Sequence, residues 1–149
     1  MANGNPNSEI TSIPRWFYTG AIMALVWNLL GVMAFIRQVV ITPEMLAKLP
    51  LAEQDLYTTV PLWVTIAFAV AVFSGALASL ALIMKKSICY QLFVISFIGV
   101  LLQMFHTLCF SNAYDVNGPS ATIMPIMAIV IALGLVRFAA KGNNNNWFS

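Results

Sequence analysis

The chain has 149 residues, of which 60% are hydrophobic and only 8% are charged, and its formal net charge is +2. Soluble domains carry about 25% charged residues, so this composition excludes a water-soluble globule with an ordinary polar surface. The sequence contains no run of basic residues, and with so small a net charge we expect no nucleic-acid partner. The length fits one domain.

Most of the chain consists of four apolar stretches, each close to the ~20 residues that an α-helix needs to cross a bilayer. They are continuously apolar, without the alternation of a strand, and the bilayer core requires that backbone groups be satisfied within the segment. We therefore predict an all-α membrane protein whose partner is the lipid bilayer. Residues 14–141 form a four-transmembrane-helix bundle, with spans at about 16–38, 61–84, 87–110 and 121–139.

The two ends of the chain are polar. Residues 1–13 hold several asparagines, and residues 142–149 contain the run Gly-Asn-Asn-Asn-Asn. Polar terminal segments of this kind usually stay loosely ordered, so we expect both to be tails outside the membrane domain.

Basic residues beside the spans predict the orientation. Because lysine and arginine accumulate on the cytoplasmic side, the side with more of them faces the cytoplasm. Both ends of the chain then lie in the cytoplasm, together with the turn between the second and third spans. That side carries Arg15, Lys85, Lys86, Arg137 and Lys141, against Arg37 and Lys48 on the outer side.

The loop between the first two spans carries signals for a helix of its own. Thr42 is a typical N-cap, Pro43 suits the first helical position, and Glu44 places an acid in the first turn. We expect a short interfacial helix in this first outer loop. It either covers the outer end of the bundle as a lid or is an ordered connector without a role.

Small residues recur on one face of each of the first two spans. Helices in lipid associate through such faces, because small side chains let two backbones approach closely. We interpret them as packing faces, and the face on the second span could also support a dimer. The residues are Gly20, Ala24 and Gly31 in the first span, and Ala71, Gly75 and Ser79 in the second.

Polar side chains inside the spans are the candidate functional residues. Asn28 lies near the middle of the first span, and Ser96, Gly99, Gln103 and His106 share one face of the third. Polar groups at such depth normally face the bundle interior and find partners there. Asn28, Gln103 and His106 either line a small cavity for a polar ligand or a proton, or hydrogen-bond neighbouring helices.

The sequence offers little for catalysis. His106 is the only histidine, no carboxylate lies within a span, and no nucleophile motif, phosphate loop or metal-binding spacing is present. Cys89 and Cys109 are 20 residues apart in one span, about 30 Å along a helix, so we expect two free, buried cysteines. We therefore predict no enzyme activity, no cofactor and no metal.

Several segments together are similar to a group of small four-span bacterial inner-membrane proteins, some automatically labelled "sugar transporter". The resemblance covers residues 13–141, and it implies a bacterial inner membrane and a four-helix bundle. The candidate positions Asn28, Gln103 and His106 fall within it. The segments are 27–35, 42–44, 61–63, 85–86, 101–106 and 124–127.

Two hypotheses about function follow. In the first, the protein binds or passes a small polar molecule, as a homo-oligomer, because transporters often need two related halves and a single four-span chain shows no internal repeat. In the second, it is a structural or accessory subunit of a larger membrane protein complex, and its small-residue faces contact the partner.

Overall fold

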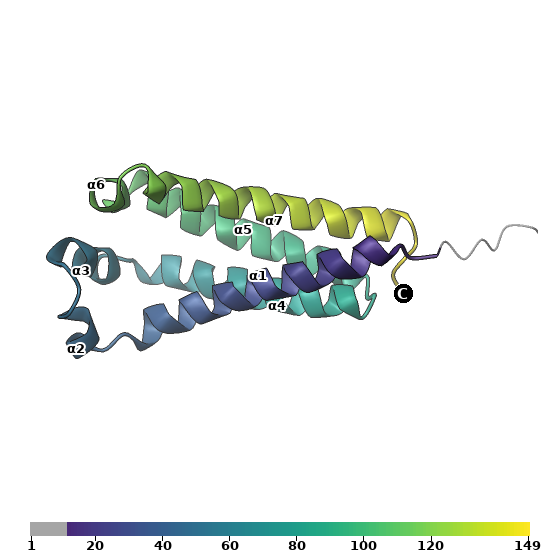
Figure 1. The fold of residues 1–149 in the computed structure, drawn as a ribbon, viewed down its shortest axis with the longest axis horizontal. Helices are drawn as coiled ribbons and strands as arrows, with labels where there is room; N and C mark the ends of the chain where they lie inside the picture. Colours follow the sequence, from purple (N-terminus) through teal and green to yellow (C-terminus); the bar gives the residue numbers. More distant parts are fainter. Residues whose placement is uncertain (1–11) are drawn as a thin grey trace, which may run out of the picture.

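The computed structural model describes residues 12–149, which form four long α-helices and three short ones (Figure 1). Each long helix is long and apolar enough to cross a membrane, so the predicted all-α, four-transmembrane-helix architecture is confirmed. The long helices are α1 (Arg15–Val40), α4 (Leu62–Ile83), α5 (Ile88–Cys109) and α7 (Ser120–Asn144). The short helices are α2 (Pro43–Leu46), α3 (Leu51–Thr58) and α6 (Ala113–Asn117).

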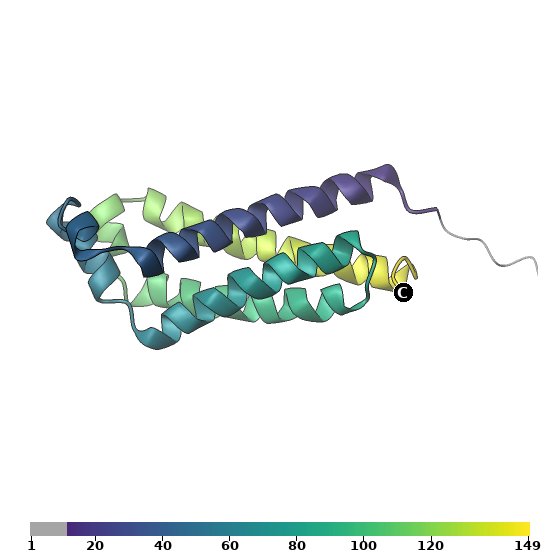
Figure 2. The same ribbon diagram turned by 90° about the horizontal axis from the view of Figure 1, so that it is seen from below.

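The long helices follow one another around the bundle in the order α1, α4, α5, α7. Helices α4 and α5 form a central antiparallel hairpin, α1 packs against α4, and α7 packs against α5 (Figures 1 and 2). The first and last helices of this row meet at one end of the bundle and lie farther apart at the other (Figure 1). The bundle is therefore incompletely closed between α1 and α7.

The two ends of the bundle differ in what they carry. One end holds the start of α1, the turn between α4 and α5, and the end of α7; we call it the aromatic end, for the ring cluster described below (Figure 1). The other, the loop end, holds α2, α3 and α6. In the α2 segment Thr42 Oγ1 accepts a hydrogen bond from the Met45 backbone N–H at 3.2 Å, which confirms the short helix predicted in this loop.

The small residues of α1 lie between helices. A Cβ added at Gly20 would come within 3.0 Å of the Phe138 ring on α7, and one at Gly31 within 3.0 Å of Val72 on α4. Ala24 is 3% exposed. The absence of larger side chains at these positions therefore lets α1 approach its two neighbours closely.

The small-residue face of α4 is also covered by other helices of the same chain. Ala71 and Ser79 are almost fully buried, and Gly75 is buried beneath side chains of α1 and α5. This face therefore has no free surface, and the expectation that it supports a dimer is wrong. The reason is that α1 and α5 pack on it from both sides.

The C-terminal segment is ordered, so the prediction of a loose tail at 142–149 is wrong. Helix α7 continues to Asn144 and ends in a Schellman turn, in which Asn146 adopts a left-handed φ of 54°. The Trp147 backbone N–H donates to the Gly142 carbonyl at 3.0 Å. This turn reverses the chain and returns Trp147 and Phe148 to the bundle.

The returning segment packs against the buried core. Trp147 and Phe148 contact the cluster around Phe17, and the Ser149 backbone N–H donates to the Lys85 carbonyl in the α4–α5 turn at 2.9 Å. At the other end of the chain Ile13, placed in the predicted tail 1–13, also packs on this core. Residues 1–11 of that tail lie outside the described part of the chain.

Candidate functional site

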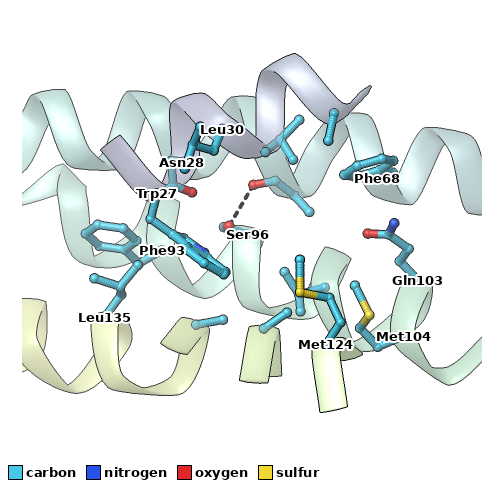
Figure 3. A pocket seen from close by; sticks show the side chains of 17 residues that line it. Trp27, Asn28, Leu30, Phe68, Phe93, Ser96, Gln103, Met104, Met124 and Leu135 are labelled. Carbon is cyan, nitrogen blue, oxygen red and sulfur yellow. Dashed lines mark hydrogen bonds between the residues drawn. The ribbon is translucent and has the colours of Figure 1, made fainter. Parts of the chain in front are cut away.

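A cavity of about 230 Å³ lies among the four long helices and is lined by 17 residues (Figure 3). We call it the central cavity. Most of its lining is aliphatic, aromatic or methionine side chains, and the polar atoms come from Trp27, Asn28, Ser96 and Gln103. It is therefore an apolar space with a few hydrogen-bonding groups, which is the usual composition of a small-molecule site.

The central cavity opens sideways between α1 and α7. Its floor is made by α4 and α5, and its two walls are α1 and α7. Leu30 on one wall is 56% exposed, and Met124 on the other is 61% exposed. Because both walls are helices long and apolar enough to span a membrane, a mouth between them would face the hydrocarbon of the bilayer rather than water.

Asn28 joins α1 to α4 and also lines the cavity. Its Nδ2 donates to the Ala24 carbonyl at 2.8 Å and to Ser79 Oγ at 3.1 Å, and Ser79 in turn donates to the Gly75 carbonyl. A carbonyl can only accept, so the amide nitrogen must face Ala24. The amide oxygen then points toward Gly75 and accepts no hydrogen bond from the described residues.

Gly75 makes room for two polar side chains. A Cβ at this position would overlap the Asn28 amide and would lie 2.9 Å from Ser96 Oγ. Ser96 Oγ donates to the Ala71 carbonyl of α4 at 2.6 Å, the dashed line in Figure 3. The glycine therefore allows side chains from α1 and α5 to meet against α4 at the cavity wall.

Gln103 lies at the loop-end side of the central cavity (Figure 3). It also lines a second cavity. This second space, of about 190 Å³, is bounded by residues of α1, α3, α4, α5 and α6. We call it the polar pocket, because six of its ten lining residues carry polar side chains. They are Gln38, Thr59, Gln103, His106, Thr107 and Ser111.

His106 belongs to the polar pocket and not to the central cavity. Its ring lies edge-on to Trp63, with 5.6 Å between centroids, and is stacked near Phe110 at 6.0 Å. The three predicted site residues are thus divided. Asn28 and Gln103 line one cavity, Gln103 and His106 line the other, and Gln103 is shared.

The hydroxyl groups of the polar pocket already take part in hydrogen bonds within the chain, two as donors and Ser111 as an acceptor. Thr107 donates to the Gln103 carbonyl, Thr59 donates to the Asp55 carbonyl, and Ser111 accepts from a backbone N–H. The side chains of Gln38, Gln103 and His106 hydrogen-bond none of residues 12–149. No lysine, arginine, aspartate or glutamate lines this pocket. It therefore presents uncharged amide groups and an imidazole.

The cysteine and acidic side chains of residues 12–149 do not form a metal site. Within residues 12–149 no group of three histidine, cysteine, aspartate or glutamate side chains is close enough to hold a metal ion. Cys89 is free and buried, as expected, but Cys109 is exposed at the end of α5. The expectation of two buried cysteines is wrong for Cys109, because its side chain lies on an exposed face of the last turn of α5.

Sequence reasoning missed the apolar lining of the central cavity. On α7, Met124, Ala128, Ala132 and Leu135 recur at steps of four, four and three and form one wall. That spacing is visible in the sequence and marks one helix face. An apolar face toward a cavity and one toward lipid have the same composition, so the pattern alone does not separate them.

No protein-family model matches this chain, and no curated protein or solved structure is similar enough to match it. The function is therefore inferred from the two cavities and their chemistry.

Proposed function

We propose that this integral membrane protein takes up a membrane-soluble small molecule from the bilayer into the central cavity. The observation that carries the proposal is the cavity between α1 and α7, apolar in most of its lining and open at its side. A molecule dissolved in the hydrocarbon reaches this mouth without crossing water. Asn28, Ser96 and Gln103 supply the few polar contacts that orient it.

The size and lining of the cavity support an apolar ligand. An engineered apolar cavity of about 150 Å³ takes up benzene, and the central cavity is larger, at about 230 Å³. A small polar molecule, the ligand expected from sequence, would leave most of its own hydrogen-bonding groups unpaired against such a lining. The lining therefore favours a mostly apolar molecule.

A binding role also agrees better with these residues than catalysis does. The two cavities contain one histidine, no carboxylate and no cysteine, so a nucleophile paired with a base is not assembled there. We propose that the protein is not an enzyme.

The location follows from the sequence. We propose a bacterial inner membrane, as the resemblance to small four-span proteins implies, with the aromatic end in the cytoplasm. The excess of lysine and arginine at that end supports this orientation.

The accessory-subunit and homo-oligomer hypotheses have less support. Both relied on free small-residue faces, but the faces of α1 and α4 are in contact with other helices of the same chain. A partner would have to use another surface of the bundle.

Native mass spectrometry of the purified protein in mild detergent tests the proposal. We expect the wild type to retain a bound small molecule, and Ala128→Phe, which fills the cavity from the α7 wall, to lose it. Leu133→Phe is the matched control, since Leu133 is on α7 but does not line the cavity. Retention of the molecule by Ala128→Phe, or its absence from the wild type, would contradict the proposal.

A further inference from the structure

We infer that the site takes an amphipathic molecule whose uncharged, hydrogen-bonding head group lies in the polar pocket and whose apolar chain lies in the central cavity. This inference rests on the proposed function and specifies the chemistry of its ligand. It starts from the position of Gln103, which lines both spaces. In the inferred complex an elongated molecule would extend from one space into the other past this side chain.

The two spaces differ in polarity in the same way as the two parts of a lipid molecule, an apolar chain and a polar head group. The central cavity lies within the spans, where the surroundings are hydrocarbon, and the polar pocket lies at the loop end. Leu56 of α3, Thr59 at its C-cap and Ala113 of α6 bound the polar pocket. These loop helices would separate the head group from bulk water, so its hydrogen bonds to protein meet less competition.

Three side chains are free to bind the head group. The Gln38 and Gln103 amides and the His106 imidazole come from α1 and α5 and hydrogen-bond none of residues 12–149. Each amide carries donors and an acceptor. Hydroxyl, ester and amide head groups match this set.

Among residues 12–149 the polar pocket is lined by no acid, lysine or arginine, and this composition argues against an ionic head group. An ionised head group removed from water requires an opposite charge or several strong donors, and none of the ten lining residues is an acid, a lysine or an arginine. Arg37 lines a separate surface hollow together with Gln38 and Tyr57. An anionic ligand would use Arg37 instead of Gln103 and His106.

Binding of four probes with the same ten-carbon chain to the full chain in mild detergent tests the inference. The probes are decane, 1-decanoylglycerol, decanoate and decyltrimethylammonium. We expect 1-decanoylglycerol to bind about tenfold more tightly than either charged probe, which corresponds to one well-placed hydrogen bond. Equal or tighter binding of decanoate, lost in Arg37→Gln, would overturn the uncharged head group.

Substitutions in the polar pocket test whether its side chains cause the tighter binding of 1-decanoylglycerol. Gln103→Leu and His106→Phe should each weaken 1-decanoylglycerol about tenfold and leave decane unchanged. The His106→Phe variant keeps the ring contacts to Trp63 and Phe110, so it separates hydrogen bonding from packing. An equal loss of decane and 1-decanoylglycerol would contradict the head-group assignment.

Binding of decane also distinguishes the proposed uptake into the central cavity from the inference about the head group. If decane binds to the wild type and Ala128→Phe blocks it, the central cavity is a site whatever the head group. If decane does not bind at all, the proposed function itself fails. If decane binds but the head groups are not distinguished, only the present inference is overturned.

Discussion

The aromatic end and the loop end of the bundle are built from the same four helices but are packed in opposite ways. At the aromatic end α1 and α7 are joined through stacked and edge-on rings, and Phe17 is completely buried against Phe138, with centroids 5.4 Å apart. Toward the loop end the same two helices lie farther apart (Figure 1), and the central cavity lies between them within the spans. The bundle is therefore closed between α1 and α7 at the aromatic end and open between them farther along.

The comparison shows which part of the protein supplies stability and which part is available for binding. Helices in lipid gain little from the hydrophobic effect and associate through packing and hydrogen bonds. The aromatic end provides both, because its rings interlock and Ser149 hydrogen-bonds the α4–α5 turn. With one end held in this way, the other end can keep an open cavity.

The largest expected effect tests this division directly. Phe17→Ala removes a fully buried ring and should lower the free energy of unfolding by about 3 kcal/mol, as for other buried phenylalanines. The matched control is Phe105→Ala at the loop end, where the ring is 56% exposed and the loss should be under about 1 kcal/mol. Denaturant unfolding in bicelles measures both, and equal losses would contradict the difference between the ends.

A smaller effect is expected at the junction between the two regions. Gly75→Ala places a methyl group on the Asn28 amide and close to Ser96, and this overpacking should cost about 2 kcal/mol. Gly134→Ala on α7 is the control, because nothing lies within 4 Å of the added methyl, and it should be neutral or stabilise by up to about 1 kcal/mol. Thermal unfolding in mild detergent distinguishes them; a neutral Gly75→Ala would show that Asn28 is not confined there.

The smallest expected effect concerns the turn that returns the C-terminal segment. Asn146→Ala puts an alanine at a φ of 54° and should cost about 1 kcal/mol, whereas Asn146→Gly should be neutral. Asn145→Ala is the control, since Asn145 has a φ of −90°. Hydrogen exchange of the Trp147 backbone N–H, which donates to Gly142, reports the turn; equal exchange in all variants would mean that Asn146 does not hold it.

The C-terminal segment shows where sequence reasoning stopped short. Composition marks residues 142–149 as polar, yet an asparagine followed by a large apolar residue is the pattern of a Schellman turn, in which the apolar side chain returns to the helix. Asn146 and Trp147 fit it. The average polarity of the segment predicts a loose tail because it hides the two aromatic residues, Trp147 and Phe148, that pack against the core and are partly buried.

The candidate site was predictable only in part. The depth of Asn28 and Gln103 in their spans indicated polar groups that must face other helices, and both do line the central cavity. That Gln103 would be shared with a second pocket, and that His106 would lie only in that pocket, depends on how α3 and α6 fold over the loop end.

The four spans and the short loop helix could be derived from the sequence, because they depend on local properties: the length of each apolar stretch, the need to satisfy backbone groups in lipid and the cap at Thr42. The partners of each helix face could not. Small residues predict that two helices approach closely, but they do not identify the partner helix. An apolar face has the same composition whether it contacts lipid, another helix or a cavity. The row α1, α4, α5, α7, the burial of the α4 face and the opening between α1 and α7 all follow from complementary shapes among residues far apart in the chain.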